Sequence, residues 1–372
     1  MPTAQYLLSA ILALLPSPHL QESLKALLLL LLQGHGKARP QHSQTKSASA
    51  LSRFFNRYAW PTRTLIRLAR REAEKALDRA RPRRGPKPRL LVVLDLVTLE
   101  KRGLFRALPL SFFHGKWGLH LGVVYLVHGE LRIPWSYRVW RGKGEKSLSL
   151  LALRLLASLP PWMRKAFRVR VVADTAFGTI RFLRGVRELG LEAVVGMRRD
   201  RRLWGGERLA DLRRQGSRVH LRGVSFPLWA FRYRYPLPGG GWEWRYGVAT
   251  FPASPRTLLV WGRRRFSIEH FFKAMKSEFS LGQFGQRTAL GVHRFLVLSL
   301  LAYLLAHWVK LASEEKGCTW WEAGREAARR LFPELVALIL SRELSLLGLW
   351  PPPPGKGVED ACLCGICGRC KF

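Results

Sequence analysis

Two aspartates stand in otherwise apolar segments of this sequence. Asp95 interrupts the run Leu90 to Val97, and Asp174 follows the run Val169 to Ala173. Either aspartate alone is also explained as the cap of a turn after a strand. Two buried carboxylates, however, are costly to bury and would repel each other unless a cation lay between them. Carboxylate oxygens are the ligands that Mg²⁺ prefers, so the pair predicts a divalent metal site.

A third carboxylate, Glu269, lies in a segment whose apolar residues recur at helical spacing. At ~100° per residue, Arg265 and Lys276 project within ~40° of Glu269 around a helix. One stripe therefore presents a carboxylate that can hold metal between two cations that can hold phosphates. The alternative is an exposed ladder of charges, which is common on helices.

The segment Arg265-x3-Glu269-x6-Lys276 resembles the insertion-sequence transposases of the group founded on insertion sequence four, whose signature is Tyr-x2-Arg-x3-Glu-x6-Lys. The register of the tyrosine holds Gly262, next to Trp261. Segments 94–101 and 284–288 are also similar to that family, and the resemblance covers roughly residues 45 to 312.

The resemblance implies a DNA transposase with a ribonuclease H-like α/β core, a mixed sheet with a β-rich insertion. Asp95, Asp174 and Glu269 would be the catalytic acids and would share two Mg²⁺ (or Mn²⁺) ions. The reaction would be in-line phosphoryl transfer, which cleaves transposon ends and joins them to target DNA. Some relatives flip a base against an aromatic side chain. Candidates in the insertion are Trp229, Trp242 and Trp244, although aromatic residues on strands more often serve packing.

The charge of the chain points to a polyanionic partner. Lys plus Arg number 63 against 25 Asp plus Glu, which gives a net charge of +38. Such a charge destabilises a compact state by self-repulsion, and nucleic acid is the commonest polyanion that would neutralise it. The resemblance implies that this nucleic acid is double-stranded DNA. A basic helix predicted from Thr62 to Ala80 would contact terminal inverted repeats through four arginines, Arg63, Arg67, Arg70 and Arg71.

An anionic membrane is the other polyanion to consider. The apolar stretches Leu27 to Leu32 and Phe295 to Val309 fall short of the ~20 residues that span a bilayer, so both are interpreted as buried core helices. We therefore expect no membrane contact. We expect a bacterial, cytoplasmic and nucleoid-associated protein that forms a dimer on paired transposon ends.

Changes in period along the chain predict its organisation. We expect a basic helical region and linker at residues 1–88. A ribonuclease H-like catalytic core would occupy 89–282, with its β-rich insertion at about 198–258. Strands are predicted at Leu90–Val97, Leu119–Val127, Leu131–Val139, Val169–Ala173 and Ala193–Met197, with helices between the last three. A C-terminal helical subdomain would follow at 283–350, then a flexible tail rich in Pro and Cys at 351–372.

Four of the five cysteines lie in that tail, at Cys362, Cys364, Cys367 and Cys370. This is not a secreted disulfide framework. The spacing is also tighter than the two separated pairs of a typical zinc site, so we do not expect zinc there.

Two other functions fit these residues. A metal-dependent nuclease of the same fold would cut DNA without rejoining it. An inactive DNA-binding relic would keep the basic surface and use none of the acids.

Overall fold

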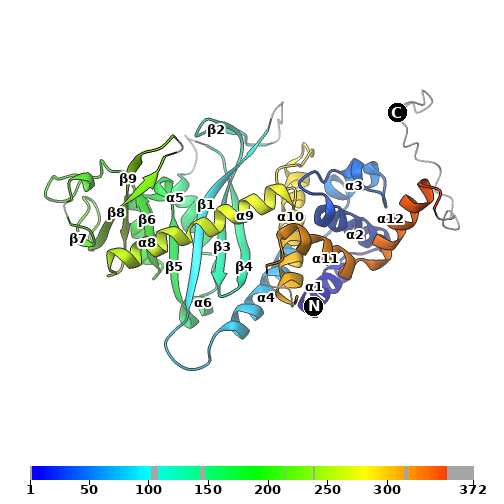
Figure 1. Ribbon diagram of the computed structural model, residues 1–372, viewed down its shortest axis with the longest axis horizontal. Coiled ribbons are helices and arrows are strands. Elements are labelled where there is room, and N and C mark those ends of the chain that lie inside the picture. The colour runs from blue at the N-terminus through cyan, green and yellow to red at the C-terminus, as the bar shows by residue number, and fades with distance from the viewer. Residues whose placement is uncertain are drawn as a thin grey trace.

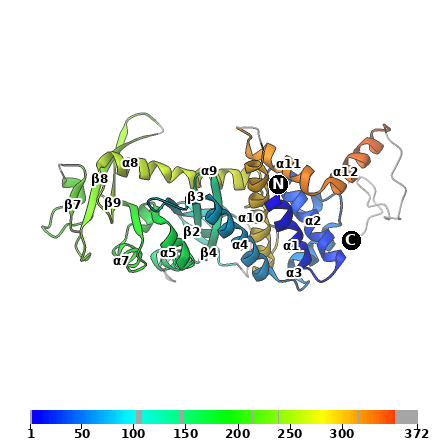
Figure 2. The ribbon, with the colours of Figure 1, turned by 90° about the horizontal axis from the view of Figure 1, so that it is seen from below.

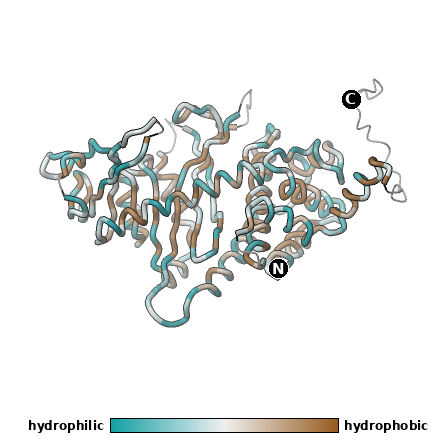
Figure 3. Tube along the Cα trace, in the orientation of Figure 1, coloured by the Kyte–Doolittle hydropathy of each residue, from teal (hydrophilic) through white to brown (hydrophobic). Residues whose placement is uncertain are grey.

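The computed structural model describes residues 2–101, 108–142, 147–212, 214–237, 239–313 and 317–349. The molecule is elongated, with a β-sheet half and a helical half joined side by side (Figure 1). Apolar segments concentrate in the central strands and in the interior of the helical half (Figure 3). The four clustered cysteines lie outside the described residues.

The described residues contain one nine-stranded mixed sheet in the order β2-β3-β1-β5-β6-β9-β8-β7, with β4 paired to β3. At its centre β1 runs parallel to β5 and antiparallel to β3, and β5 runs parallel to β6. The path β4-β3-β1-β5-β6 is the ribonuclease H-like order, which confirms the predicted fold class. The strands are β1 Arg89–Glu100, β2 Ser111–Phe113, β3 Lys116–His128, β4 Leu131–Trp140, β5 Arg168–Ala173, β6 Glu192–Met197, β7 Ser217–Val219, β8 Leu228–Pro236 and β9 Trp242–Ala249.

The strands of the predicted insertion extend this same sheet, because β9 pairs antiparallel with β6. The alternating residues from Arg218 to Phe226 predict a strand, and this prediction is wrong over most of its length, because only β7 forms there. Gly223 adopts a φ of 89°, in the left-handed region, so the chain turns where the alternating pattern predicted a ladder.

Helices cover both faces of the sheet (Figure 2). On one face lie α5 (Leu148–Leu156) and α7 (Ile180–Glu188), and on the other α8 (Pro255–Arg264) and α9 (Phe266–Ser277). A short helix, α6 (Pro161–Ala166), precedes β5. Helix α8 was not predicted, although Ser254 caps its N-terminus and Pro255 occupies its first turn, a recognisable start signal.

The helical half combines segments from both ends of the chain around α10 (Ala289–Leu311), which packs against α1, α2, α3, α4 and α11. The sequence from Trp321 to Leu347 predicts one long helix, but that helix is broken at Pro333, which cannot continue a helix. The helices are α1 Pro2–Ala13, α2 Pro18–Gln33, α3 Ala48–Asn56, α4 Thr62–Ala80, α11 Trp320–Leu331 and α12 Pro333–Leu346, with 3-10 turns η1 Pro40–His42, η2 Thr175–Phe177 and η3 Leu209–Asp211.

Helix α10 is long and apolar enough to cross a membrane by length and composition alone. In this structure 78% of its most apolar window is buried inside the protein. Its composition is thus explained by its place at the centre of the helical half, as predicted for Phe295 to Val309.

Candidate active site

Asp95 and Asp174 are neighbours because β1 and β5 are parallel and adjacent. The last registered pair of the two strands is Leu94 with Ala173, so the next residue of each strand is one of the aspartates. Adjacent strands lie ~4.8 Å apart, which brings the two carboxylates into electrostatic contact. Asp174 is held further by its own turn, where its Oδ1 accepts a hydrogen bond of 2.9 Å from the Ala176 amide.

A glycine allows the turn after Asp174 to pack against β6. A Cβ atom on Gly196 would lie 2.7 Å from the Thr175 hydroxyl and 2.8 Å from the Thr175 amide nitrogen. Both distances are too short for real contacts, so any side chain at this position would displace the turn. Gly196 therefore helps to place the Asp174 carboxylate.

Arg265, at the junction of α8 and α9, bridges the strand acid and the helix acid. Its Nη1 donates to Asp95 Oδ2 at 2.9 Å, and its Nη2 donates to Glu269 Oε1 at 2.5 Å. The other oxygen of Asp95 accepts a hydrogen bond of 2.8 Å from the Leu96 amide. Glu269, which the sequence places far from both aspartates, thus lies beside Asp95 with one guanidinium between them.

Asp95 and Asp174 are destabilised in their charged form despite this guanidinium. Burial, with repulsion from Asp174, raises the pKa of Asp95 to about 7. Burial also raises the pKa of Asp174. Burial alone would lower the pKa of Arg265, but the carboxylates around it outweigh that effect and raise it. The site therefore has more negative charge than one arginine neutralises.

This donor set is chemically suited to a hard divalent cation, because its ligands are carboxylate oxygens held at the edge of a rigid sheet. Among the described residues, however, no three His, Cys, Asp or Glu side chains lie close enough to hold one metal ion. The arrangement present is that of acids bridged by Arg265. For a cation to bind all three acids, their side chains would have to rearrange.

Lys276 lies in the last turn of α9, and its side chain reaches β1. Its Nζ donates to the Thr98 carbonyl at 3.2 Å. Burial lowers its pKa, and repulsion from Lys116 adds to the effect. The predicted Arg265, Glu269 and Lys276 stripe thus runs along β1, with Arg265 and Glu269 at Asp95 and Lys276 beyond them.

A cleft of about 300 Å³ opens beside Asp174 and Arg265. Tyr233 and Arg245 line it from the β8–β9 hairpin, opposite each other in the strand register. Arg198 and Arg199 line it from the segment after β6. The sequence did not single out the lining residues from the hairpin and from the segment after β6. The alternation of Arg and Tyr from Arg232 to Tyr235 could nevertheless have indicated a basic, aromatic surface.

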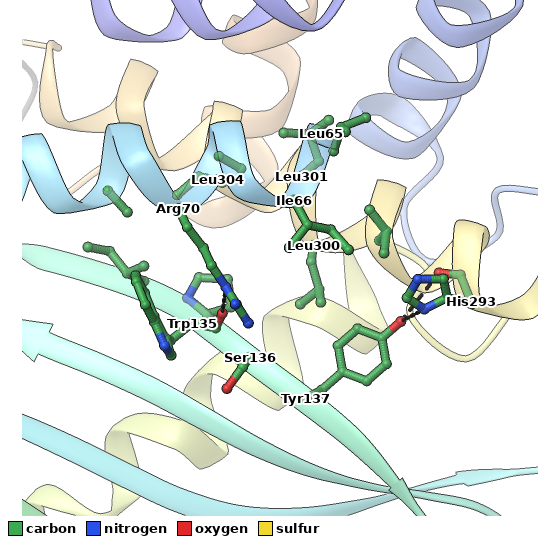
Figure 4. A pocket seen from close by; sticks show the side chains of 15 residues that line it. Leu65, Ile66, Arg70, Trp135, Ser136, Tyr137, His293, Leu300, Leu301 and Leu304 are labelled. Carbon is green, nitrogen blue, oxygen red and sulfur yellow. Dashed lines mark hydrogen bonds between the residues drawn. The ribbon is translucent and has the colours of Figure 1, made fainter. Parts of the chain in front are cut away.

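The four arginines predicted on α4 have different surroundings. Arg63, Arg67 and Arg71 are exposed. Arg70 instead points across to β4, where its Nε donates to the Trp135 carbonyl at 3.0 Å (Figure 4). There it lines a mostly apolar cavity of about 130 Å³ between α4, β4 and α10. Arg70 thus contributes to the junction between the two halves of the molecule.

The three candidate tryptophans are also in different places. Trp229 is half-buried and packs against the core. Trp242 and Trp244 are exposed on β9. The guanidinium groups of Arg232 and Arg234 lie 4.7 and 5.3 Å from the Trp244 ring centre, so that ring already contacts two cations.

Comparisons with known proteins identify the family of this chain and a structure with a similar fold. The family model described as "Transposase DDE domain" matches residues 114–305. The fold is similar to that of a piggyBac transposase in a synaptic complex with hairpin DNA, solved by cryo-EM. That similarity has a TM-score of 0.53 and 11% sequence identity, and covers 91% of this chain and 78% of the other. A search of curated proteins found no match.

Proposed function

The chain belongs to the transposase DDE domain family, and we propose that it cleaves transposon ends and joins them to target DNA by metal-dependent phosphoryl transfer. The observation that carries this proposal is the association of three acids around one guanidinium. Asp95, Asp174 and Glu269 come from β1, the end of β5 and α9, and all three interact electrostatically with Arg265. Asp174 lines a cleft that arginines also line.

The acids would hold two Mg²⁺ or Mn²⁺ ions. When bound, such ions activate the attacking oxygen and stabilise the leaving oxygen of an in-line displacement. Asp95 and Asp174 supply ligands that the sheet holds in place. Glu269 has a side chain that is 42% exposed, so it can adjust as the site closes. Arg265 and Lys276 neutralise the phosphates on either side of the bond that breaks.

Double-stranded DNA is the proposed partner, both as terminal inverted repeats and as target. The piggyBac structure contains DNA in a synaptic complex, and by analogy we propose that two copies of this chain pair two ends. Arg63, Arg67 and Arg71 present an exposed basic face on α4 for the DNA backbone. Because its proposed partner is DNA, we place the protein in the bacterial cytoplasm, at the nucleoid.

Two finer assignments belong to the same proposal. The Arg265, Glu269 and Lys276 spacing supports membership of the group founded on insertion sequence four. Trp242 and Trp244 are exposed enough to stack on an unpaired base, whereas the half-buried Trp229 is the weakest of the three candidates.

The experiment uses the purified chain, Mg²⁺, and oligonucleotide duplexes that carry the inverted repeats flanking its gene, with a supercoiled plasmid as target. A transposase gives cleaved ends and plasmid joined to them. Cleavage without joining would instead establish the nuclease alternative. Binding without cleavage in either Mg²⁺ or Mn²⁺ would establish the inactive relic.

A further inference from the structure

We propose that Arg265 and a divalent cation are alternative occupants of the same carboxylates, so that metal binding releases Arg265 to bind a DNA phosphate. This inference rests on the proposed function and adds an order of events to it. The arginine would keep the acids together before DNA arrives and would become a phosphate ligand afterwards.

The hydrogen bonds of the site carry the first step. Asp95 already uses Oδ1 for the Leu96 amide, and Arg265 takes Oδ2. Arg265 also takes Oε1 of Glu269. A cation that bound Asp95 through Oδ2 or Glu269 through Oε1 would compete with the guanidinium for that oxygen. It would also repel the guanidinium at contact distance, in a site that is partly shielded from water.

Besides these hydrogen bonds, the Arg265 guanidinium lies 5.6 Å from the centre of the Phe266 ring and is attracted to Asp174. Within the described part of the chain, the hydrogen bonds of its side chain go to these two carboxylates. Its side chain is 22% exposed and borders two open regions, the cleft of about 300 Å³ beside Asp174 and one of about 580 Å³ between the β8–β9 hairpin and α8. A displaced guanidinium therefore has space to enter.

The surroundings indicate what Arg265 would bind there. Arg245 lines both regions, and Arg198 and Arg199 line the first, so the charge of these walls suits an anion. A planar guanidinium binds phosphate through two parallel hydrogen bonds. A DNA phosphate in the cleft would thus receive Arg265, and it would also offset the repulsion between Arg265 and the metal.

The test measures metal binding without DNA and without catalysis, by calorimetric titration of Mn²⁺ into the full-length protein. Arg265→Ala and Arg265→Gln remove the competing charge, and the Gln variant keeps an amide donor near Asp95 if the Ala variant folds poorly. Arg264→Ala is the matched control, since this neighbouring arginine is exposed and stacks on Trp261. Asp95→Ala reports whether the titrated site is the proposed one.

We expect both Arg265 variants to bind Mn²⁺ about tenfold or more tightly than wild type, within the usual range of coupling between two ligands. Arg264→Ala should match wild type, and Asp95→Ala should lose binding. Equal or weaker binding by both Arg265 variants, with Asp95→Ala still deficient, would overturn the exchange and leave the proposed function intact. Undiminished binding by Asp95→Ala would refute the metal site itself, and the exchange with it.

Discussion

The hydroxyl groups of Tyr125 and Tyr303 form a hydrogen bond of 2.9 Å in the core, where the sheet meets the helical half. Both rings also contact Phe271 of α9, Tyr125 by stacking at 4.5 Å and Tyr303 edge-on at 5.0 Å. Helix α9 carries Glu269, so this buried pair helps to fix the helix that brings the third acid to the sheet.

Breaking that pair should destabilise the fold in a non-additive way. Tyr125→Phe or Tyr303→Phe each leaves one buried hydroxyl without its partner, which costs about 1–3 kcal/mol of unfolding free energy. The double variant removes both polar groups and should lose no more than either single variant. Urea unfolding of the four proteins measures this, and losses that simply add would show that the hydroxyls do not interact.

His307 should make the protein sensitive to acid. Burial, with repulsion from Arg132 and Lys310, lowers its pKa to about 3. Its neutral Nε2 accepts a hydrogen bond of 2.9 Å from the Arg132 amide. Because the folded pKa lies below the ordinary value of ~6.5, this stability is complete above pH ~6.5 and falls as pH drops from there toward 3.

The measurement is thermal unfolding of wild type and His307→Gln at pH 7 and pH 5. The variant keeps an acceptor for Arg132 but does not titrate. Wild type should lose up to about 1.4 kcal/mol per pH unit below 6.5 from this group, and the variant should lose less over the same interval. Equal losses would mean that His307 does not remain neutral and buried in acid.

The sequence predicted secondary structure best where one hydrophobic pattern continued over a whole strand or helix. The apolar runs around Asp95 and before Asp174 predicted β1 and β5, and parallel strands then bring their ends together. Periodicity failed where backbone restrictions override it, as at Gly223 and Pro333. The sequence also could not show that Arg70, and not another arginine of α4, bonds to β4. All four arginines contribute equally to the basic pattern of the helix, and only the position of the neighbouring strand decides which of them it contacts.

The arginines of α4 should separate into two classes when tested singly. Arg63→Ala, Arg67→Ala and Arg71→Ala should weaken DNA binding, and each phosphate that is no longer neutralised should reduce the log–log salt slope by about 0.9. Arg70→Ala should leave that slope unchanged and lower the melting temperature, since it removes the bond to Trp135. Fluorescence anisotropy of labelled DNA at several salt concentrations distinguishes the two classes. If none of the four variants changes the salt slope, α4 is not part of the DNA interface.

Gly196→Ala should impair cleavage by moving the turn that holds Asp174. The added Cβ would meet the Thr175 amide nitrogen at 2.8 Å. Gly205→Ala is the matched control, because nothing lies within 4 Å of a Cβ there. We expect the first variant to bind DNA and cut it slowly and the second to resemble wild type. Full activity of Gly196→Ala would show that the turn tolerates displacement.

The central claim is that Asp95, Asp174 and Glu269 act together, and Glu269 is its most exposed member. The most direct test is Mg²⁺-dependent cleavage of transposon-end DNA by Glu269→Ala, with a gel shift on the same preparation and Lys276→Ala beside it. Glu269→Ala should bind ends and not cut them, as should Asp95→Ala and Asp174→Ala, whereas Lys276→Ala should bind more weakly and still cut. Normal cleavage by Glu269→Ala would contradict the account. Glu278 would then be the next acid to test, although its carboxylate lies 3.6 Å from His35 at the far end of α9.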